Sequence, residues 1–504
     1  MDAGESARAM HLFESAAYDG ELVLDKKAAY ATLVLSDELY IKSQSAEDRQ
    51  RWLNKHTEYA LRFVQLYPTD SRSNEIALHA AEISFSNQLH QQTAQLANLV
   101  KDDAPADLRF NANNLQARAH VAREQYADAE VVYMELLSNP QISVKQKREL
   151  NDGLALAIYR QAEQAKAAHQ LTEAKQHFAR VSELAPASDI ASSGLFDAIA
   201  LAMGNNSWND AIVYIKRFQQ LYPGHKRSQE VSRQLSVAYL KSNQDDKAAR
   251  ELERIARSDD SEDVQMAALW QAAELYESKK DYQGAIRSYR DYAHKYPTPF
   301  PQNMEAMFKL TQLYQKTGNA ENKYFWQRKI HAVDSKATKR VKNDRTSFIA
   351  STAVLELARE KKINFNQVKL VEPLAVNLKR KKDLMQQAIK LYGQASSYGV
   401  ADITTESTFS IGSIYQKFSQ SLLESERPTN LNAEELEQYN ILLEDQAFPF
   451  EEKAIEFYET NLARVRQGNY NEWIENSFKS LVTLFPVRFA RHGKIGAYLG
   501  EDIQ

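Results

Sequence analysis

Helical spacing recurs at a fixed interval through the middle of the chain. Four alanines lie 37 residues apart, at Ala174, Ala211, Ala248 and Ala285. Large apolar residues follow each alanine four and seven positions later, at Phe178, Ile215, Leu252 and Tyr289 and at Val181, Phe218, Ile255 and Tyr292. These offsets place one small and two large side chains on the same face of an α-helix. The pattern therefore predicts a repeated helix with one buried face.

A second amphipathic helix precedes each of these alanines. Its clearest copy is residues 268–276, where Ala272, Ala273 and Tyr276 form the predicted inner stripe. A proline closes three of the four units, at Pro186, Pro223 and Pro297. Helix, short turn, alanine-bearing helix and proline over 155–297 resemble the tetratricopeptide repeat, whose period is about 34 residues. The resemblance implies an all-α fold, an α-solenoid of stacked helix-turn-helix repeats with a less regular helical C-terminal third.

Weaker copies of the pattern extend on both sides and define the expected domains. These are N-terminal helical hairpins over 1–110, the repeat array over 111–330, a basic linker over 331–345, a C-terminal helical-repeat domain over 346–486 and a tail over 487–504. The linker is either a loop or the solvated end of a helix. In the C-terminal domain, Asn432 is placed to cap a helix, with Glu435 as its capping-box partner. Pro449 predicts a break in that helix.

Composition supports long helices and excludes several classes of protein. The 504 residues include only 15 Gly and 12 Pro, so turns are few. The absence of Cys excludes disulfides, cysteine-ligated metals and thiol catalysis. A net charge of -4 gives no indication of a nucleic-acid partner. The sequence contains no apolar stretch of about 18 residues, so it predicts no transmembrane segment.

The sequence lacks the motifs that assemble catalytic or cofactor sites. We find no phosphate-binding glycine loop, no dinucleotide-binding glycine pattern, no His-Glu-x-x-His and no nucleophile elbow. His169 is expected in a turn and His177 on the next helix, which argues against a shared metal. The acidic residues of 434–459 are expected to form a solvated face. We therefore predict a non-enzymatic protein with no catalytic residue, cofactor or metal; a glycan-processing or glycan-binding protein is the less favoured alternative.

The first helix of each hairpin lines the concave face of such a solenoid. The resemblance implies that its fifth position faces this groove, which gives Tyr159, Phe196, Arg233 and Trp270. Later positions of the same helices add Met203, Leu240 and Glu274. Aromatic side chains and Arg often carry interface energy, so the stripe predicts a groove for an extended or helical peptide. The alternative is that these side chains pack between repeats as core.

The C-terminal third resembles a more specific group of proteins. The runs 425–428, 435–439 and 446–455 and the segment 473–486 are similar to large Gram-negative periplasmic tetratricopeptide proteins. That group is associated with TonB–ExbB–ExbD or Tol-like envelope motors and with gliding machinery. The resemblance implies a periplasmic scaffold that binds partner proteins of such a complex, with peripheral association to the envelope. Those proteins carry an export signal and further repeats ahead of this region, which are not seen here, so a cytosolic peptide-binding adaptor stays open.

Overall fold

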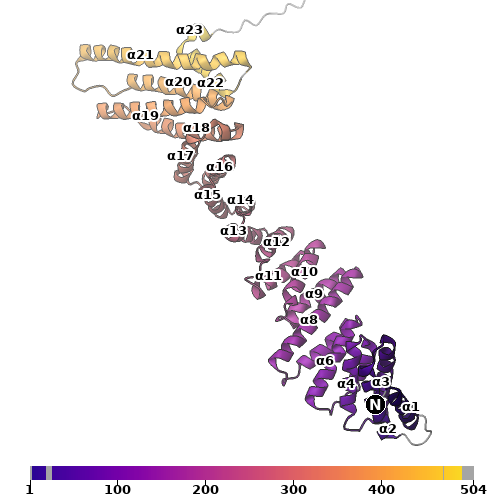
Figure 1. The fold of residues 1–504 in the computed structure, drawn as a ribbon. Coiled ribbons are helices and arrows are strands. Elements are labelled where there is room, and N and C mark those ends of the chain that lie inside the picture. Colours follow the sequence, from indigo (N-terminus) through magenta and orange to yellow (C-terminus); the bar gives the residue numbers. More distant parts are fainter. Residues whose placement is uncertain (1–2, 19–24, 469, 491–504) are drawn as a thin grey trace, which may run out of the picture. The chain divides into compact units, whose positions relative to one another are not determined.

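The protein consists of helices throughout the residues that can be described. A computed structural model describes residues 3–18, 25–468 and 470–490, with 23 α-helices and two short 3-10 helices and, over those ranges, no strand. The prediction of an all-α solenoid is confirmed. The chain divides into two compact units, residues 1–244 and 245–504. Figure 1 shows each unit as a succession of helices that run back and forth along the chain.

The described residues of the first unit form twelve helices, and each packs against the next along the chain. They are α1 Ala3–Tyr18, α2 Lys26–Lys42, α3 Ala46–Leu66, α4 Ser73–Ser86, α5 His90–Ala97, α6 Ala106–Ala122, α7 Tyr126–Leu137, α8 Val144–Ala167, α9 Leu171–Leu184, α10 Ile190–Gly204, α11 Trp208–Leu221 and α12 Ser228–Lys241. Helices separated by one intervening helix, such as α8 and α10, are also in contact. This nearest-neighbour pattern is typical of repeat proteins.

The second unit continues the same arrangement with longer helices toward its C-terminal end. Its elements are α13 Asp245–Ser258, α14 Glu262–Ser278, α15 Tyr282–Lys295, α16 Phe300–Lys316, α17 Ala320–Lys336, η1 Lys339–Val341, α18 Asp344–Gln367, α19 Leu374–Ser396, α20 Ala401–Leu423, α21 Ala433–Ala463, η2 Arg464–Gln467, α22 Glu472–Leu484 and α23 Pro486–Phe489. The longest, α21, packs along α20 and then against α22.

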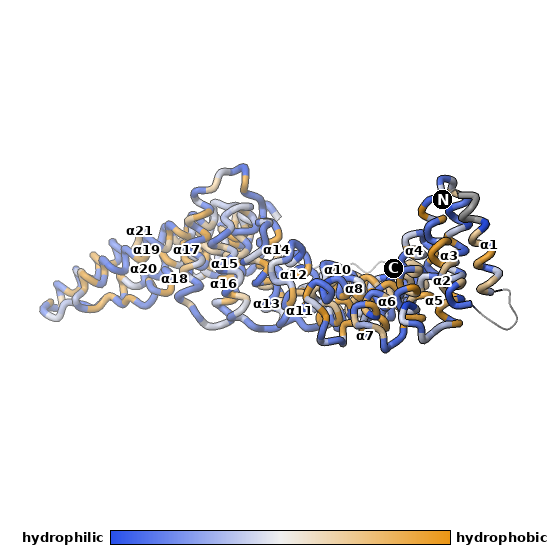
Figure 2. The backbone as a smooth tube through the Cα atoms, turned by 60° about the horizontal axis from the view of Figure 1, so that its bottom comes forward, coloured by the Kyte–Doolittle hydropathy of each residue, from blue (hydrophilic) through white to orange (hydrophobic). Residues whose placement is uncertain are grey.

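The predicted apolar faces form the core. All four repeat alanines are fully buried, and so are the large residues at the next two positions of each face, none of which is more than 4% exposed. Ala272, Ala273 and Tyr276 of α14 are buried as predicted. Figure 2 shows hydrophobic residues alternating with hydrophilic ones along the helices of both units. Each helix is thus held by its neighbours rather than by its own propensity.

The turn inside each hairpin repeats with the same 37-residue period as the buried alanines. His169, Asn206, Asn243 and Lys280 lie 37 residues apart, and all have φ between 58° and 63°. The residue after each donates its backbone N–H to a carbonyl five residues earlier, as Gln170 does to Ala165 at 2.8 Å. This is the Schellman ending, in which a left-handed residue terminates the helix and satisfies a free carbonyl. His169 therefore lies in a turn, as predicted.

The predicted basic linker, 331–345, contains the last turns of α17, the short helix η1 and the first residues of α18. Asn432 caps α21: its side-chain oxygen accepts from the backbone N–H of Glu435, and its own backbone N–H donates to the Glu435 carboxylate. The predicted break at Pro449 is wrong, because α21 continues through it. Ala447 and Ala454 on either side are buried, and this packing compensates for the lost backbone hydrogen bond.

Two expectations concern the ends and the membrane. Within the predicted tail, 487–504, the first residues belong to α23, and residues 491–504 lie outside the described part of the chain. Over the described ranges, no helix combines the length and the apolar character that crossing a lipid bilayer requires.

Candidate partner-binding surface

Tyr159 lies on α8 and points toward the next repeat. Its hydroxyl donates to the carboxylate of Asp197 on α10 at 2.6 Å, and its ring meets the ring of Phe178 edge-on with centroids 5.0 Å apart. Burial, and then the bond to Asp197, raise the pKa of Tyr159, so the phenol stays protonated. The side chain is half-buried. It therefore joins two repeats while part of its ring remains accessible.

Phe196 occupies the equivalent position on α10. Its ring is half-buried and carries the guanidinium of Arg227 4.0 Å above its centroid. Arg227 immediately precedes α12, so this cation–π contact again connects one repeat with the next. Met203, two turns further along α10, is also half-buried.

On α12, Arg233 is exposed and Leu240 is half-buried. Val237 lies between them on the same helix and is 41% exposed. In the first unit, the residues predicted to face the groove are thus neither fully buried as core nor all exposed. Both aromatic side chains contact the adjacent repeat and remain half-buried. That a peptide binds at these positions stays a prediction.

Trp270 and Glu274 lie on α14 in the second unit. The indole packs edge-on against Tyr289 and Tyr292 of α15, with both centroid distances 5.3 Å, and its Nε1 donates to Glu274 at 2.8 Å. Trp270 is half-buried at the rim of the core, whereas Glu274 is exposed. Glu274 also lines a hollow of about 470 Å³ together with Lys309 and Lys316, which places mixed charge beside it.

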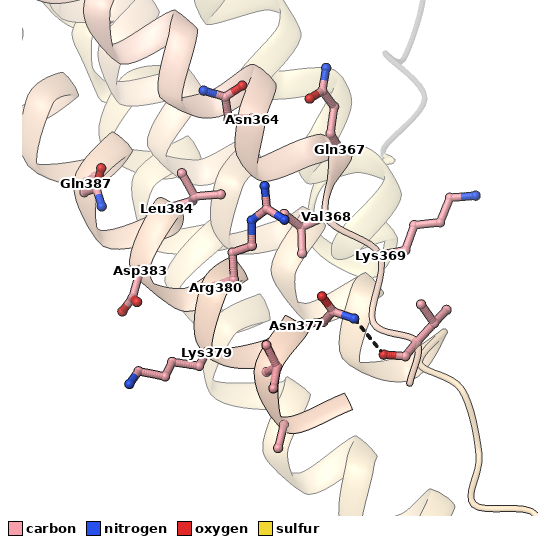
Figure 3. A pocket seen from close by; sticks show the side chains of 13 residues that line it. Asn364, Gln367, Val368, Lys369, Asn377, Lys379, Arg380, Asp383, Leu384 and Gln387 are labelled. Atoms are coloured by element: carbon pink, nitrogen blue, oxygen red, sulfur yellow. Dashed lines mark hydrogen bonds between the residues drawn. The ribbon is translucent and has the colours of Figure 1, made fainter. Parts of the chain in front are cut away.

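The sequence did not predict a large hollow at the junction of α18 and α19 (Figure 3). It has a volume of about 1120 Å³ and is lined by three basic side chains, one acidic one and four amides: Lys369, Lys379, Arg380, Asp383, Asn364, Gln367, Asn377 and Gln387. Asn377 donates to the Val371 carbonyl at 2.9 Å and holds the connecting segment against α19. The surplus of positive charge and amides suits an acidic or strongly polar group.

A buried lysine lies next to the hollow and binds the backbone of the lining residue Val368. Lys381 is 1% exposed, and its ammonium donates to the backbone carbonyls of Phe365 and Val368 at 3.2 and 2.8 Å. These carbonyls belong to the last turn of α18, where a cation satisfies groups that lack helical partners. Burial, and to a smaller degree Lys417, lower the pKa of Lys381 to about 8. The only sequence signal for this arrangement is the basic run 379–382, which is typical of a solvated face.

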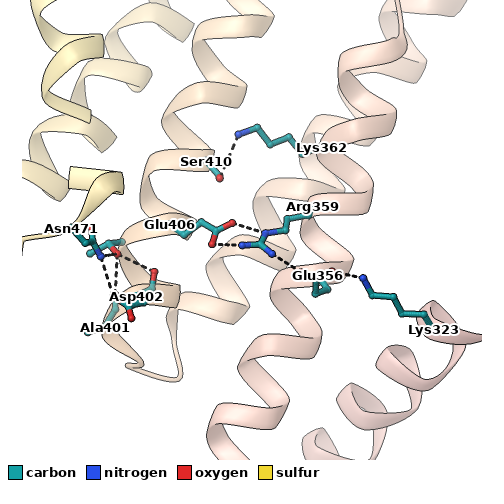
Figure 4. A network of polar contacts seen from close by, with 10 residues as sticks. Lys323, Glu356, Arg359, Lys362, Ala401, Asp402, Glu406, Ser410 and Asn471 are labelled. Carbon is teal, nitrogen blue, oxygen red and sulfur yellow. Dashed lines mark hydrogen bonds and ion pairs between the residues drawn. The ribbon is translucent and has the colours of Figure 1, made fainter. Parts of the chain in front are cut away.

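A second polar feature fixes α17, α18 and α20 together (Figure 4). Arg359 binds both carboxylate oxygens of Glu406 at 2.5–2.6 Å and also pairs with Glu356 at 2.5 Å, and Glu356 in turn binds Lys323 at 2.7 Å. Burial alone would raise the pKa of Glu356, but Lys323 and Arg359 hold it below its usual range. Because every carboxylate here is paired with a cation, the network is suited to positioning helices rather than to proton transfer.

Two family models match parts of the chain. A model described as an outer membrane lipoprotein matches residues 151–265, and a tetratricopeptide repeat model matches residues 267–299. The repeats are of the tetratricopeptide type. None of the curated proteins matches the sequence.

Several solved structures are also similar to this chain. They include the apo form of RapI, with 13% identity, a TM-score of 0.24 and coverage of 79% of this chain and 99% of that one. A tetratricopeptide repeat protein from Parabacteroides merdae has 12% identity and a TM-score of 0.21, covering 56% and 98%. The TPR domain of P58(IPK) has 13% identity and a TM-score of 0.21, covering 79% and 99%.

Proposed function

We propose that this tetratricopeptide protein is a non-enzymatic scaffold of the bacterial cell envelope that binds partner proteins through the first helices of its repeats. The observation that carries the proposal is the recurrence of a large side chain, half-buried or exposed, at the same position of three successive first helices, in Tyr159, Phe196 and Arg233. Tyrosine and arginine are among the residues that most often dominate binding energy at protein interfaces.

The shape of these side chains suits a peptide or helix rather than a small molecule. Met203, Val237 and Leu240 supply apolar surface next to Phe196 and Arg233 on α10 and α12. An amphipathic partner helix would place its apolar side on this surface. Because Tyr159 and Phe196 are already held by contacts with the next repeat, they lose little rotamer freedom on binding, which favours affinity.

Location and partners rest on two resemblances. The match of residues 151–265 to an outer membrane lipoprotein model supports the envelope. The similarity of 425–486 to periplasmic proteins of TonB- or Tol-like systems supports, as partners, the proteins of such a motor complex. A cytosolic adaptor would use the same surface with a different set of partners, so the experiment must identify what is bound.

Site-specific photo-crosslinking in native cells tests both parts of the proposal. A photoreactive phenylalanine analogue replaces Phe196 or Arg233, and the matched control replaces Val213, which is 57% exposed on the second helix α11. We expect crosslinks at positions 196 and 233, weak or none at 213, and envelope proteins among the captured partners. Equal capture at 213 would overturn the binding surface, and exclusively cytosolic partners would overturn the location.

A further inference from the structure

Two histidines and an aspartate from three consecutive helices converge in the first unit. Asp37 lies on α2, His56 on α3 and His79 on α4, and one ligand-type atom of each lies within 4.8 Å of the others. His79 Nε2 is 3.6 Å from Asp37 Oδ2, and the two imidazole rings meet edge-on with centroids 6.2 Å apart. The three side chains share a hollow of about 180 Å³ with the apolar residues Tyr30, Leu33, Val34 and Ile76.

The hydrogen bonds fix the tautomer of His56. The Ser36 hydroxyl donates its single proton to the Leu33 carbonyl at 2.9 Å. At 3.1 Å from His56 Nδ1, the Ser36 oxygen must therefore accept, so Nδ1 carries the proton. In a neutral imidazole, Nε2 then has a free lone pair. Burial lowers the pKa of His56, although Asp37 opposes this and His79 adds to it.

This lone pair has no counterpart in the surrounding protein. His56 is 4% exposed, and its Nε2 has no hydrogen-bond partner among the described residues. The Oδ1 of Asp37 is likewise buried and unpartnered within that part of the chain. Two electron-rich atoms thus face one small space without a donor between them. Buried polar groups are normally satisfied, so this arrangement calls for an electron-pair acceptor.

We propose that Asp37, His56 and His79 bind one divalent transition-metal ion of the zinc class. Two imidazole nitrogens and one carboxylate oxygen are a donor set that zinc and its first-row neighbours prefer, whereas calcium and magnesium require mainly oxygen ligands. Metal–ligand bonds of about 2.0–2.2 Å place tetrahedral ligand atoms about 3.3 Å apart. Rotation of His79, whose side chain is 57% exposed, with small shifts of the Asp37 and His56 side chains, brings the three ligand atoms to this spacing from within 4.8 Å of one another.

The site has the supporting structure of a built metal centre. Ser36 accepts from the non-ligating nitrogen of His56, which orients the ring and raises its basicity. Three protein ligands leave a fourth position for water or a partner's side chain. The bound ion joins α2, α3 and α4 and so stabilises the first helices of the unit.

Zinc titration of the full-length, chelator-treated protein tests the proposal. Calorimetry with zinc chloride compares the wild type with His79→Ala, Asp37→Asn and the control His11→Ala, an exposed histidine on α1. We expect one high-affinity zinc per wild-type and His11→Ala chain, and at least ten-fold weaker binding by the other two variants. Ser36→Ala is a positioning variant and should weaken binding by about ten- to a hundred-fold.

Two further measurements make the result unambiguous. Zinc should raise the melting temperature of the wild type and of His11→Ala but not of His79→Ala, whose exposed side chain can be removed without disturbing the core. Cobalt(II) should give the visible absorption of a four-coordinate site only where the three ligands are intact. The proposal is overturned if His79→Ala and Asp37→Asn bind zinc as the wild type does, or if the wild type binds none tightly.

Discussion

The turn residue of each hairpin has a positive φ, a backbone conformation that is unfavourable for any residue with a Cβ atom. Lys280 has φ of 63°, a conformation in which a Cβ atom costs roughly 1–2 kcal/mol. The turn between α16 and α17 has Gly318 at φ 71°, where no such cost arises. The strain is tolerated at the other turns because the Schellman hydrogen bonds and the packing of both helices determine the backbone there.

Lys280→Gly is expected to stabilise the protein by about 0.5–1 kcal/mol, because relief of the left-handed strain exceeds the entropy that glycine gains in the unfolded chain. Urea unfolding followed by circular dichroism measures the change. Lys280→Ala is the matched control, since it removes the same charge but keeps the Cβ atom, and it should lack this stabilisation. Equal effects of the two substitutions would assign the change to charge rather than to the backbone.

The buried ammonium of Lys381 makes the stability of the second unit depend on alkaline pH. Burial lowers its pKa to about 8 in the folded state, whereas an unfolded lysine titrates near about 10.4. Below pH 8 both states hold the proton. Between the two pKa values the unfolded state binds more protons, so the free energy of unfolding rises with pH.

We therefore expect the contribution of Lys381 to stability to increase from pH 7.5 to pH 9.5, and Lys381→Met to lose this increase. Urea unfolding of the wild type and the variant is measured at several pH values. The difference between them isolates the contribution of Lys381 to the free energy of unfolding, because both proteins share all other titrating groups. Lys382→Met, on the same basic run but exposed, is the control and should follow the wild type. A parallel pH dependence in the Lys381 variant would contradict the assignment.

At the scale of the element, α21 shows how tertiary packing outweighs a local signal. Phe450 on this helix meets Phe418 of α20 with ring centroids 4.7 Å apart, and Tyr458 donates to Gln416 at 2.7 Å. These contacts lie on the C-terminal side of Pro449 and keep its helix in line with the residues before it. The proline has no N–H to offer the Asp445 carbonyl, so the helix carries one missing bond at this turn.

Pro449→Ala should restore that bond and stabilise the second unit by about 1–3 kcal/mol, less than or equal to the full difference in helix propensity between the two residues. Pro449 is exposed, so the substitution removes little packing. Thermal and urea unfolding measure the gain, with the exposed neighbour Gln446→Ala as a control expected to lie within about 0.5 kcal/mol of the wild type. A loss of stability would mean that the helix depends on a kink at the proline.

The sequence predicted the elements whose signals are local. The spacing of Ala174 and its repeats, the cap at Asn432 and the turn at His169 each depend on residues within about one or two helical turns. The interruption expected at Pro449 failed because its outcome depends on α20, which no local pattern contains. The burial of Lys381 beside the hollow at α18–α19 could not be predicted, because this residue is indistinguishable in sequence from its solvated neighbours.

The candidate sites divide in the same way. The position of Tyr159, Phe196 and Arg233 on successive first helices follows from the period, but their partial burial depends on contacts with the following repeat. The convergence of Asp37, His56 and His79 leaves no sequence motif, because the three residues lie on three different helices. Such a cluster becomes visible only when helix packing is known.

At the scale of the whole molecule, interactions connect mainly helices that are adjacent in the chain or separated by one helix. The bond from Tyr159 to Asp197 joins α8 to α10, and the bond from Arg359 to Glu406 joins α18 to α20. In such a linear array, the free energy of unfolding is close to the sum of the stabilities of the single repeats and of the interfaces between neighbouring repeats. A surface formed by successive repeats can therefore be extended or modified without a new global core, which suits a scaffold.

This argument predicts that damage to one part of the array stays local. Phe178, 2% exposed in the core of α9, packs against Tyr159, and Phe178→Ala should cost about 3–5 kcal/mol through the cavity it leaves. Hydrogen exchange followed by mass spectrometry should show faster exchange in α8–α11, while α18–α20 keep their protection. Phe418→Ala, at a fully buried position of α20, is the reciprocal variant and should spare α8–α11. Faster exchange in both regions from either substitution would show a single cooperative unit, and the nearest-neighbour account of this solenoid would then fail.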